Sequence, residues 1–506
     1  MARRRSGSIQ NRRRNRHRSL AQTRRRNEQY AALVADPKSH FKSTSTATTD
    51  KDNIKNYLSR PYDNASAIAA ALRKAYVASS VVGKVIDYYQ SHPTYNYTVF
   101  PVLGNKVYDV NGNMQQDFID VAYALNRLNI PTNAPYFFKE TLIDGVTYFY
   151  KIEDSTGIVY MKFPSEWCRI SNVTDGVYRY RIDMSKIKAE FADSLPQELQ
   201  TAYQTYTGGK ISADDPKWYD SKWYMVSELG VAFTFDYNSL FNGGTAISPF
   251  ANALVDSLEL DQAKDNIDIK DQLDTTRLIH SKIPVDSNGE PTLDLEVAKI
   301  FDQQMRSRLP EGAVAVSSPS TITNVPLKGA GNEGVYATVN SGLEQLFVDL
   351  GVSEPLFGGP TNSSQVVKET IKKDANWIYT NLFPMLENYY NFELTQVKTK
   401  SKTPWNIKFI RESNFTLKDD IANYKDLLSY GGSRLDYLAA TGSSPIKIAS
   451  QLKFEQEVLD IDSLMVVKPT SNTISGNNTN NPNKGKPGRP VTDDPTDDTD
   501  RINGAK

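Results

Sequence analysis

Residues 351–360 read Gly351-Val352-Ser353-Glu354-Pro355-Leu356-Phe357-Gly358-Gly359-Pro360. The three glycines permit backbone angles that other residues avoid, and the two prolines block helix continuation. Helical periodicity precedes this break at residues 333–350 and follows it from residue 364, with Asn362, Ser363 and Ser364 as candidate caps. An apolar face continues past Pro384 to Leu394, so the proline kinks the second helix rather than ending it. The stretch therefore predicts a helix, a short break and a long helix.

A further helical segment lies upstream of this stretch. Residues 249–276 predict a helix about 40 Å long, at 1.5 Å per residue. Between it and residue 333, the pattern predicts strands at 278–285, 312–316 and 322–327 and a helix at 293–308. Two helices thus flank a small α/β insertion.

The rest of the chain mixes helical and strand periodicity, which indicates an α+β fold. Helices are expected at residues 64–90 (capped by Asn64 and ended by His92-Pro93), 115–128, 184–205, 417–430 and 445–458. Strands are expected at 95–100, 230–236 and 405–410. From Pro135 the pattern has period two, and strands at 147–152, 158–163 and 177–182 predict an antiparallel meander.

Length and composition bound the class of protein. At 506 residues the chain exceeds the usual limit of a single core, and 39% apolar residues suffice for sizeable cores. Its single cysteine, Cys168, excludes an intramolecular disulfide and fits a reducing cytoplasm. No apolar run approaches the roughly 18–20 residues that a membrane span needs. The polar ends, residues 1–50 and those beyond 466, are expected to be mostly disordered.

A net charge of zero conceals a strong asymmetry. Eleven arginines and no acid lie within residues 1–26, namely Arg3, Arg4, Arg5, Arg12, Arg13, Arg14, Arg16, Arg18, Arg24, Arg25 and Arg26. The remaining chain carries 48 basic and 59 acidic residues, a net charge of −11. Each arginine can neutralise a phosphate and release a counterion, which predicts salt-sensitive nucleic-acid binding by this arm. An acidic protein surface is the alternative target.

No motif for catalysis or metal binding emerges from the chain. The four histidines, His17, His40, His92 and His280, are far apart in sequence, and none is paired with Cys168 at metal-ligand spacing. Gly208-Gly209-Lys210 lacks the remaining residues of a phosphate-binding loop and predicts a turn. We therefore expect no catalytic residue, no metal and no cofactor.

Two features carry a physical hypothesis. Asp261, Asp265 and Asp268 fall at i, i+4 and i+7 of the helix at 249–276, which places them on one face. That face is either an ordinary solvated one or the wall of a channel that repels polyanionic DNA. In the break, Leu356 and Phe357 stand as apolar residues on a flexible turn, either in a plain helical hairpin or at a constriction.

The order of these elements over residues 55–460 resembles the portal (head–tail connector) proteins of tailed bacteriophages. The resemblance implies an α+β portal fold whose parts are an arm at 1–50, wing segments at 51–248 and 399–442, a first stem helix at 249–276, a clip at 277–331, a second stem helix at 332–350, a tunnel loop at 351–363, a long wing helix at 364–398, a crown at 443–465 and a polar tail at 466–506. The arginine-rich arm is not a general trait of that family.

The resemblance also implies a function and partners. Portal subunits form a dodecameric ring at one vertex of the virion, and double-stranded DNA passes through it during packaging and ejection. The large terminase subunit and head-completion (adaptor) proteins dock on the ring, which also contacts major capsid and scaffold proteins. The family has no catalytic residue, cofactor or membrane association. Carried onto this chain, Leu356, Phe357, Gly358 and Gly359 form the tunnel loop, and Asp261, Asp265 and Asp268 face the channel.

Two other classes stay open. A capsid or internal virion structural protein would use the arginine arm to bind the genome, but it gives no reason for two helices around an insertion. A nucleic-acid-processing enzyme without recognisable motifs is the second alternative.

Overall fold

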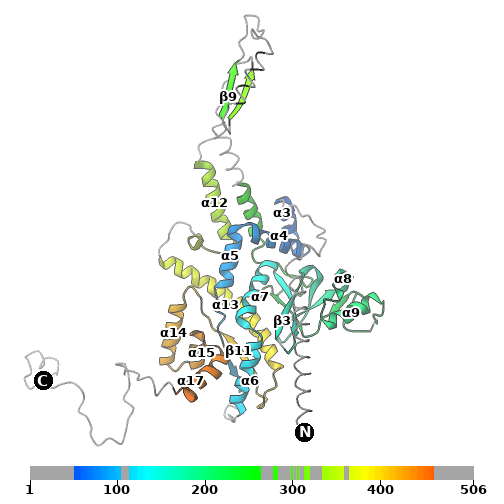
Figure 1. Cartoon of the computed structure of the whole chain (residues 1–506), viewed down its shortest axis with the longest axis vertical. Coiled ribbons are helices and arrows are strands. Elements are labelled where there is room, and N and C mark those ends of the chain that lie inside the picture. Colours follow the sequence, from blue (N-terminus) through cyan, green and yellow to red (C-terminus); the bar gives the residue numbers. More distant parts are fainter. Residues whose placement is uncertain are drawn as a thin grey trace, which may run out of the picture. The chain divides into compact units, whose positions relative to one another are not determined.

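A computed structural model describes residues 51–103, 113–155, 157–212, 214–263, 277–282, 313–318, 333–357 and 364–460, with residues 297, 300, 304 and 307 in isolation (Figure 1). The chain divides into two compact units, residues 1–451 and 452–506. The arm at 1–50, the tail beyond 466, most of the helix expected at 293–308 and the strand expected at 322–327 lie outside the described residues.

Three helices begin the described chain: α3 (Lys51–Ser59), α4 (Ala65–Ala78) and α5 (Ser80–Ser91). The prediction of one helix over 64–90 is wrong, because Ser79 is extended (φ −91°, ψ 116°) and divides it. The corner is tight: a Cβ on Gly83 would lie 2.7 Å from the Tyr76 carbonyl oxygen. Asn64 does not cap α4 with its side chain, which instead donates to the Arg60 carbonyl. The corner lets each helix bury its own apolar stripe.

Two further helices are α6 (Asn113–Arg127) and α7 (Ile130–Asp144). The first was expected, but the period-two reading from Pro135 onward is wrong up to Asp144, because α7 includes Pro135 within its helix. Phe137, Phe138 and Leu142 on α7 are fully buried. A helix that is apolar on most of its circumference lies inside a core and has no polar stripe like that of a surface helix. The sequence pattern of α7 therefore does not show helical periodicity.

A seven-stranded sheet follows α7 in the chain. Its strands are β2 (Val146–Glu153), β3 (Ile158–Phe163), β4 (Cys168–Thr174), β5 (Val177–Asp183), β6 (Trp218–Tyr219), β7 (Trp223–Met225) and β8 (Gly230–Thr234). The spatial order is β3-β2-β8-β5-β7-β6, with β4 paired to β5. The predicted β2–β3 hairpin is confirmed, but the meander is not: β8 separates β2 from β5, and β4 was missed.

Both faces of this sheet are buried. Alternation along β2 and β8 sends Phe149, Val231 and Phe233 into the main core and Tyr148 and Ala232 into a second core. The short helix α8 (Ala189–Ala192) precedes α9 (Gln197–Thr207), and α9 covers the second core with Leu199 and Ala202. Pro196 separates these two helices, where a single helix over 184–205 was expected.

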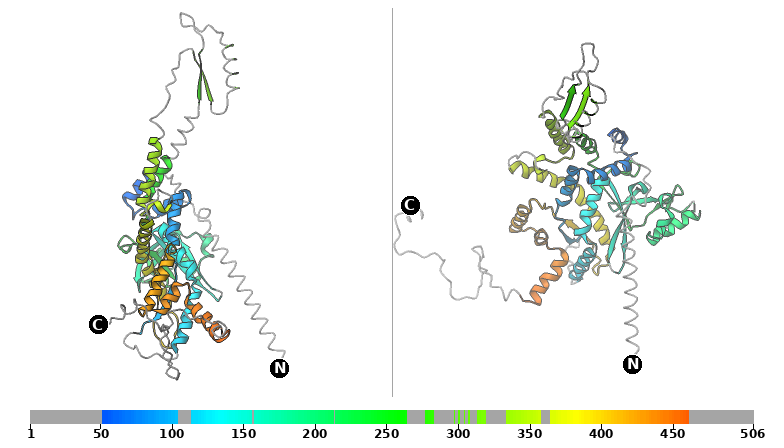
Figure 2. Two further views of the ribbon diagram at one scale, coloured as in Figure 1. Left: turned by 90° about the vertical axis from the view of Figure 1, so that its left-hand side faces the viewer. Right: turned by 45° about the horizontal axis from the view of Figure 1, so that its top comes forward.

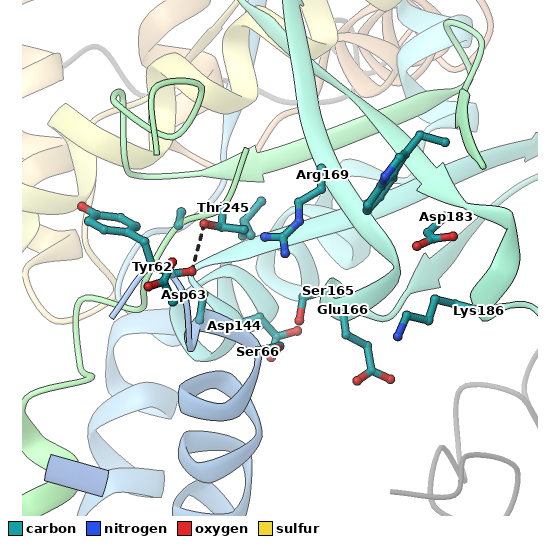
Figure 3. Close-up of a pocket in the computed structure, with 14 residues that line it drawn as sticks. Tyr62, Asp63, Ser66, Asp144, Ser165, Glu166, Arg169, Asp183, Lys186 and Thr245 are labelled. Carbon is teal, nitrogen blue, oxygen red and sulfur yellow. Dashed lines mark hydrogen bonds between the residues drawn. The ribbon is translucent and has the colours of Figure 1, made fainter. Parts of the chain in front are cut away.

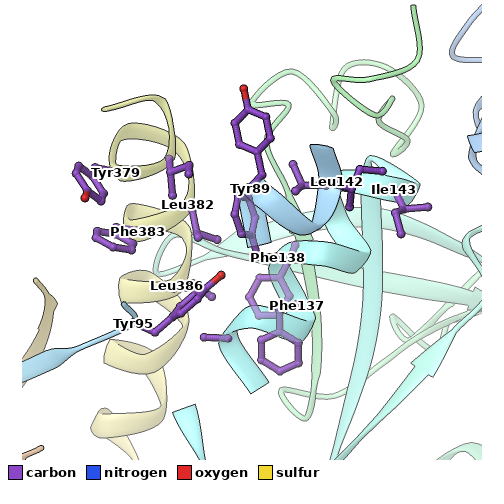
Figure 4. Packing of buried hydrophobic residues seen from close by; sticks show 14 of the residues in the cluster. Tyr89, Tyr95, Phe137, Phe138, Leu142, Ile143, Tyr379, Leu382, Phe383 and Leu386 are labelled. Carbon is purple, nitrogen blue, oxygen red and sulfur yellow. The ribbon is translucent and has the colours of Figure 1, made fainter. Parts of the chain in front are cut away.

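The main core is built around α13 (Ser364–Thr395), a helix of 32 residues. Leu382 and Leu386 of α13 are fully buried, facing Phe137 and Phe138 of α7 (Figure 4). The helix continues through Pro384, as predicted. Beside it, β1 (Tyr97–Pro101) pairs antiparallel with β11 (Trp405–Phe409), which joins residues near the two ends of the described chain.

The described chain closes with α14 (Leu417–Ser429), α15 (Arg434–Ala440), α16 (Pro445–Lys447), the π-helical turn η4 (Ile448–Leu452) and α17 (Lys453–Glu457). The helix α14 was expected, whereas α15 was not. The helix predicted over 445–458 is divided into three short pieces. The second unit holds α17.

The elements around the break were largely expected. Residues 253–263 are helical, and α12 (Glu333–Asp349) lies beside them (Figures 1 and 2). Between them in sequence, β9 (Arg277–Lys282) pairs in parallel with β10 (Ala313–Ser318), close to two of the expected strands. The break begins after α12 and contains the 3₁₀ turn η3 (Glu354–Phe357). The rest of the helix expected at 249–276 lies outside the described residues.

Candidate functional site at the helix pair and the break

The helix pair, residues 253–263 and α12, packs in close antiparallel contact. Leu260 and Leu346 are 2% and 0% exposed. The Cδ1 atom of Leu260 lies 3.6 Å from the position that a Cβ on Gly342 would take. Because Gly342 has no side chain, Leu260 packs directly against this part of α12. One helical turn before Leu260, Asp256 hydrogen-bonds with Asp349 at the end of α12. These two contacts fix the register of the pair.

The Asp256–Asp349 contact brings two carboxyl groups together. Burial, followed by the hydrogen bond and charge of Asp349, raises the pKa of Asp256 to about 6. Gln345 donates to Asp349 Oδ1 at 3.1 Å, and Lys51 of α3 lies 2.5 Å from Glu259 on the other helix. The contact was not predicted, because it depends on a register between two helices that the sequence does not display.

Only part of the predicted acidic face lies within the residues that the structure describes. Asp261 lies on the described helix and is half-buried, whereas Asp265 and Asp268 lie outside the described residues. Gly358 and Gly359 of the break and all eleven arginines of the arm also lie outside them. Their roles stay predictions.

The break begins with a glycine turn that ends α12. Gly351 is left-handed (φ 71°), its N–H donates to the Val348 carbonyl, and the Val352 N–H donates to the Phe347 carbonyl. This pair of bonds is a Schellman motif, which satisfies carbonyls at a helix end and reverses the chain. Val352, the residue after the turn, is 7% exposed.

Leu356 and Phe357 do not stand free on this turn. Both are half-buried and pack against the main core. The Phe357 ring stacks on Phe347 of α12, with centroids 5.5 Å apart and an interplanar angle of 17°. It also meets Tyr88 of α5 edge-on at 5.6 Å. The turn thus folds both side chains back onto their own chain, and their role at a constriction stays a prediction.

Several titratable groups are buried away from the helix pair. Burial lowers the pKa of His92 to about 4 and raises those of Asp374 and Glu412 to about 6 and about 7. Burial also raises the pKa of the Cys168 thiol, which belongs to the second core. Within the described residues, no group of three or more His, Cys, Asp or Glu side chains is arranged to hold a metal ion.

A pocket of about 310 Å³ lies where the α3–α4 connection meets the sheet (Figure 3). Its lining includes the carboxylates Asp63, Asp144, Glu166 and Asp183 and the cations Arg169 and Lys186. Asp144 is held by Arg73 at 2.6 Å and by Lys162 at 2.5 Å, and Asp183 accepts from the backbone and hydroxyl of Ser185. Asp144 and Asp183, two of the four carboxylates, are therefore engaged in contacts within the fold. The pocket joins segments distant in sequence, which no local motif could indicate.

Comparisons with known proteins find similar chains among solved structures. No protein-family model matches the chain, and no curated protein matches it. A chain of the solved structure described as "Virion of native gene transfer agent (GTA) particle" is similar, with a TM-score of 0.40 and 11% identity over 72% of this chain and 88% of that chain. Within the part of the chain that the structure describes, no helix is both long and apolar enough to cross a membrane.

Proposed function

We propose that this chain is a portal subunit: a ring-forming virion protein that conducts double-stranded DNA during packaging and ejection and has no enzymatic activity. The observation that carries the proposal is the path of the chain from residue 253 to residue 395. A helix leads out of the core, an insertion containing β9 and β10 follows, α12 returns beside the first helix, and the break leads into the 32-residue α13. This is the order that the portal resemblance requires.

The contacts within the helix pair support a structural role for it. Leu260, Leu346 and Leu350 are buried at its base, so the two helices are anchored in the main core. An insertion held by two anchored helices is a suitable platform for docking other proteins. We assign terminase and head-completion proteins to this insertion, and capsid and scaffold proteins to the outer part of the ring.

Conduction of DNA would rest on charge and shape rather than on chemistry. Asp261, Asp265 and Asp268 are the candidate acids of the channel, where like charge keeps the phosphate backbone from adhering. Partly buried Asp256 and Asp349 lie between the helices, which makes them a structural contact rather than a channel surface. The ring would be part of the virion, assembled in the host cytoplasm, with no cofactor.

The state of assembly tests the proposal. The mass of the full-length chain is measured by native mass spectrometry, and the same sample is imaged in negative stain. A closed ring with a central hole is expected. Shells, filaments or a monomer that persists at high concentration would count against a portal.

The function of the break is tested separately, by measuring packaging and DNA retention in assembled virus particles. Deletion of Pro355–Gly359 is expected to leave rings assembled but to impair DNA retention. Deletion of the surface turn Gly208-Gly209-Lys210 is the matched control and should affect neither property. Normal packaging and retention without Pro355–Gly359 would remove the break from the mechanism.

The arginine arm favours a second candidate, a capsid or internal virion protein that binds the genome. Eleven arginines within 26 residues suit phosphate contacts whatever the rest of the chain does. Removal of residues 1–26 is expected to flatten the plot of log affinity for duplex DNA against log salt, whose slope is about −0.9 for each phosphate neutralised. An unchanged slope would direct the arm to an acidic protein instead. Shells in the mass measurement would make this candidate the better one.

A further inference from the structure

The Phe357 side chain is held between two other aromatic rings, which together form an aromatic clasp of Phe347, Phe357 and Tyr88. Phe347 comes from the last turn of α12 and Tyr88 from α5, more than 250 residues earlier in the chain. One contact is stacked and the other edge-on, the two geometries that aromatic pairs favour. Phe347 and Tyr88 are 6% and 8% exposed, so they belong to the core, whereas Phe357 is half-buried at its surface.

The backbone of the break delivers Phe357 to this place. The turn at Gly351 reverses the chain, and Pro355 lies in the 3₁₀ turn η3, with the Leu356 N–H donating to the Ser353 carbonyl at 3.1 Å. The Ser353 and Thr370 hydroxyls hydrogen-bond at 3.2 Å, which joins the turn to α13. No residue of η3 is itself buried. Apart from Val352, the apolar attachment of this segment therefore comes from Leu356 and Phe357, and of these Phe357 has the two aromatic partners.

Tyr88 is fixed from the other side. Its hydroxyl donates to Asp374 of α13 at 2.9 Å, and this carboxylate is 2% exposed. The Tyr88 ring also contacts His92 and Phe415 at 5.2 Å each. Phe415 lies in the connection before α14, so a single ring contacts the break on one side and this C-terminal connection on the other.

We infer that Phe357 is the latch that fastens the first half of the break, residues 351–357, to the core, and that Tyr88 is the residue that positions this latch. On this view Phe357 is an internal anchor rather than a tip that touches DNA. The statement that Phe357 does not touch DNA rests on the proposed function. The role of Phe357 as a latch, and of Tyr88 in positioning it, concerns this chain alone. A half-buried ring with two defined partners can detach without unfolding the core, because Phe347 and Tyr88 keep their other neighbours.

Hydrogen exchange of the full-length protein tests the latch. The amides of Val352 and Leu356 are protected by the two hydrogen bonds described above and report on the segment directly. Phe357→Ala is expected to speed their exchange at least tenfold while amides of α13 around Leu382 keep their rates. Leu356→Ala, which removes a neighbouring half-buried side chain outside the clasp, is the matched control and should have a smaller effect. Equal effects of the two variants, or unchanged exchange in Phe357→Ala, would overturn the inference.

Tyr88 is tested by a pair of variants with a readout that a merely structural role would not move. Tyr88→Phe keeps the ring and loses the bond to Asp374, and Tyr88→Leu loses the ring. We expect exchange at Val352 and Leu356 to be accelerated more by the leucine variant, and the effect of Phe357→Ala to disappear in its background. Additive effects would show that Tyr88 does not act through Phe357. If Phe357→Ala fails to fold, Phe357→Leu serves in its place.

These results are separable from the proposed function. Exchange is measured equally well on a ring or a monomer, so a chain that forms no ring still tests the latch. Conversely, the protein could form a ring in which Val352 and Leu356 exchange slowly both with and without the Phe357 ring. That result would leave the portal proposal intact and exclude the latch.

Discussion

Glu412→Gln is expected to change the pH dependence of stability of this protein. Glu412 is fully buried, its Oε2 accepts from Asn96 Nδ2 at 3.2 Å and from Thr94 Oγ1 at 3.3 Å, and its Oε1 has no hydrogen-bond partner within the described residues. Burial raises the pKa of this carboxyl from 4.5 to about 7, and nearby Asp420 adds to the effect. A glutamine keeps the shape and an acceptor while removing the charge.

The magnitude follows from the raised pKa. Each pH unit corresponds to about 1.36 kcal/mol, so the full difference amounts to about 3 kcal/mol. Because the folded state binds this proton more tightly than the unfolded state, the stabilisation is present below pH 4.5 and is lost as the pH rises through about 7. Between pH 5 and pH 8, Glu412 should lower the free energy of unfolding by about 2–3 kcal/mol.

Urea unfolding followed by tryptophan fluorescence measures this effect. At pH 8 the Gln variant should be more stable than the natural protein by about 3 kcal/mol, and at pH 5 by less than about 1 kcal/mol. Asp374, whose pKa is also raised, is present in both proteins, so its contribution cancels in the difference. The exposed carboxylate Glu166 provides the control variant Glu166→Gln, which should follow the natural curve. Parallel curves for Glu412→Gln and the natural protein would refute the reasoning.

Three further predictions concern the fold. Leu382→Ala removes a fully buried side chain of α13 and should cost about 2–5 kcal/mol in urea unfolding, against less than about 0.5 kcal/mol for Leu427→Ala, which is 54% exposed. Gly145→Ala should abolish the folded protein, judged by circular dichroism and gel filtration, because a Cβ would lie 2.4 Å from the Ile247 carbonyl carbon at a φ of +76°; survival of the native spectrum would contradict this. Lys162→Met leaves Glu140 and Asp144 with Arg73 alone and should cost about 3–5 kcal/mol near pH 7. These cations lower the pKa of Glu140 to about 2, against its burial, so the cost should shrink as the pH falls from about 4.5 toward 2, and a constant cost would exclude the ionic explanation.

Elements with a clean local period were predictable from the sequence. The helices α6, α12, α13 and α14 and the hairpin β2–β3 show 3.6- or 2-residue patterns bounded by Gly, Pro or polar caps. The pattern failed for α7, because a helix buried on nearly every side carries no polar stripe to reveal its period. It also failed at Ser79, where the close approach of Gly83 to Tyr76, rather than any helix breaker, creates a corner.

The candidate site was predictable only in part. The break and the helix before it could be located from glycines and prolines, and the turn at Gly351 has the expected chemistry. The destination of Phe357 could not be located, because its partner Tyr88 is brought there by tertiary packing across more than 250 residues. The same limit applies to Asp256 and Asp349, which face each other only once the two helices have taken their register.

The pairing of β1 with β11 has a consequence for how the chain folds while it is being made. Tyr97 of β1 pairs with Phe409 of β11, and Tyr88 hydrogen-bonds with Asp374, so the main core draws on both ends of the described chain. At about 5–20 residues per second, a ribosome needs roughly 15–60 s to deliver β11 after β1 has emerged. During that interval the apolar faces of the N-terminal helices stay exposed, and chaperones can bind them. The main core can close only after β11 has left the ribosome, which delays any subunit assembly that needs the closed core.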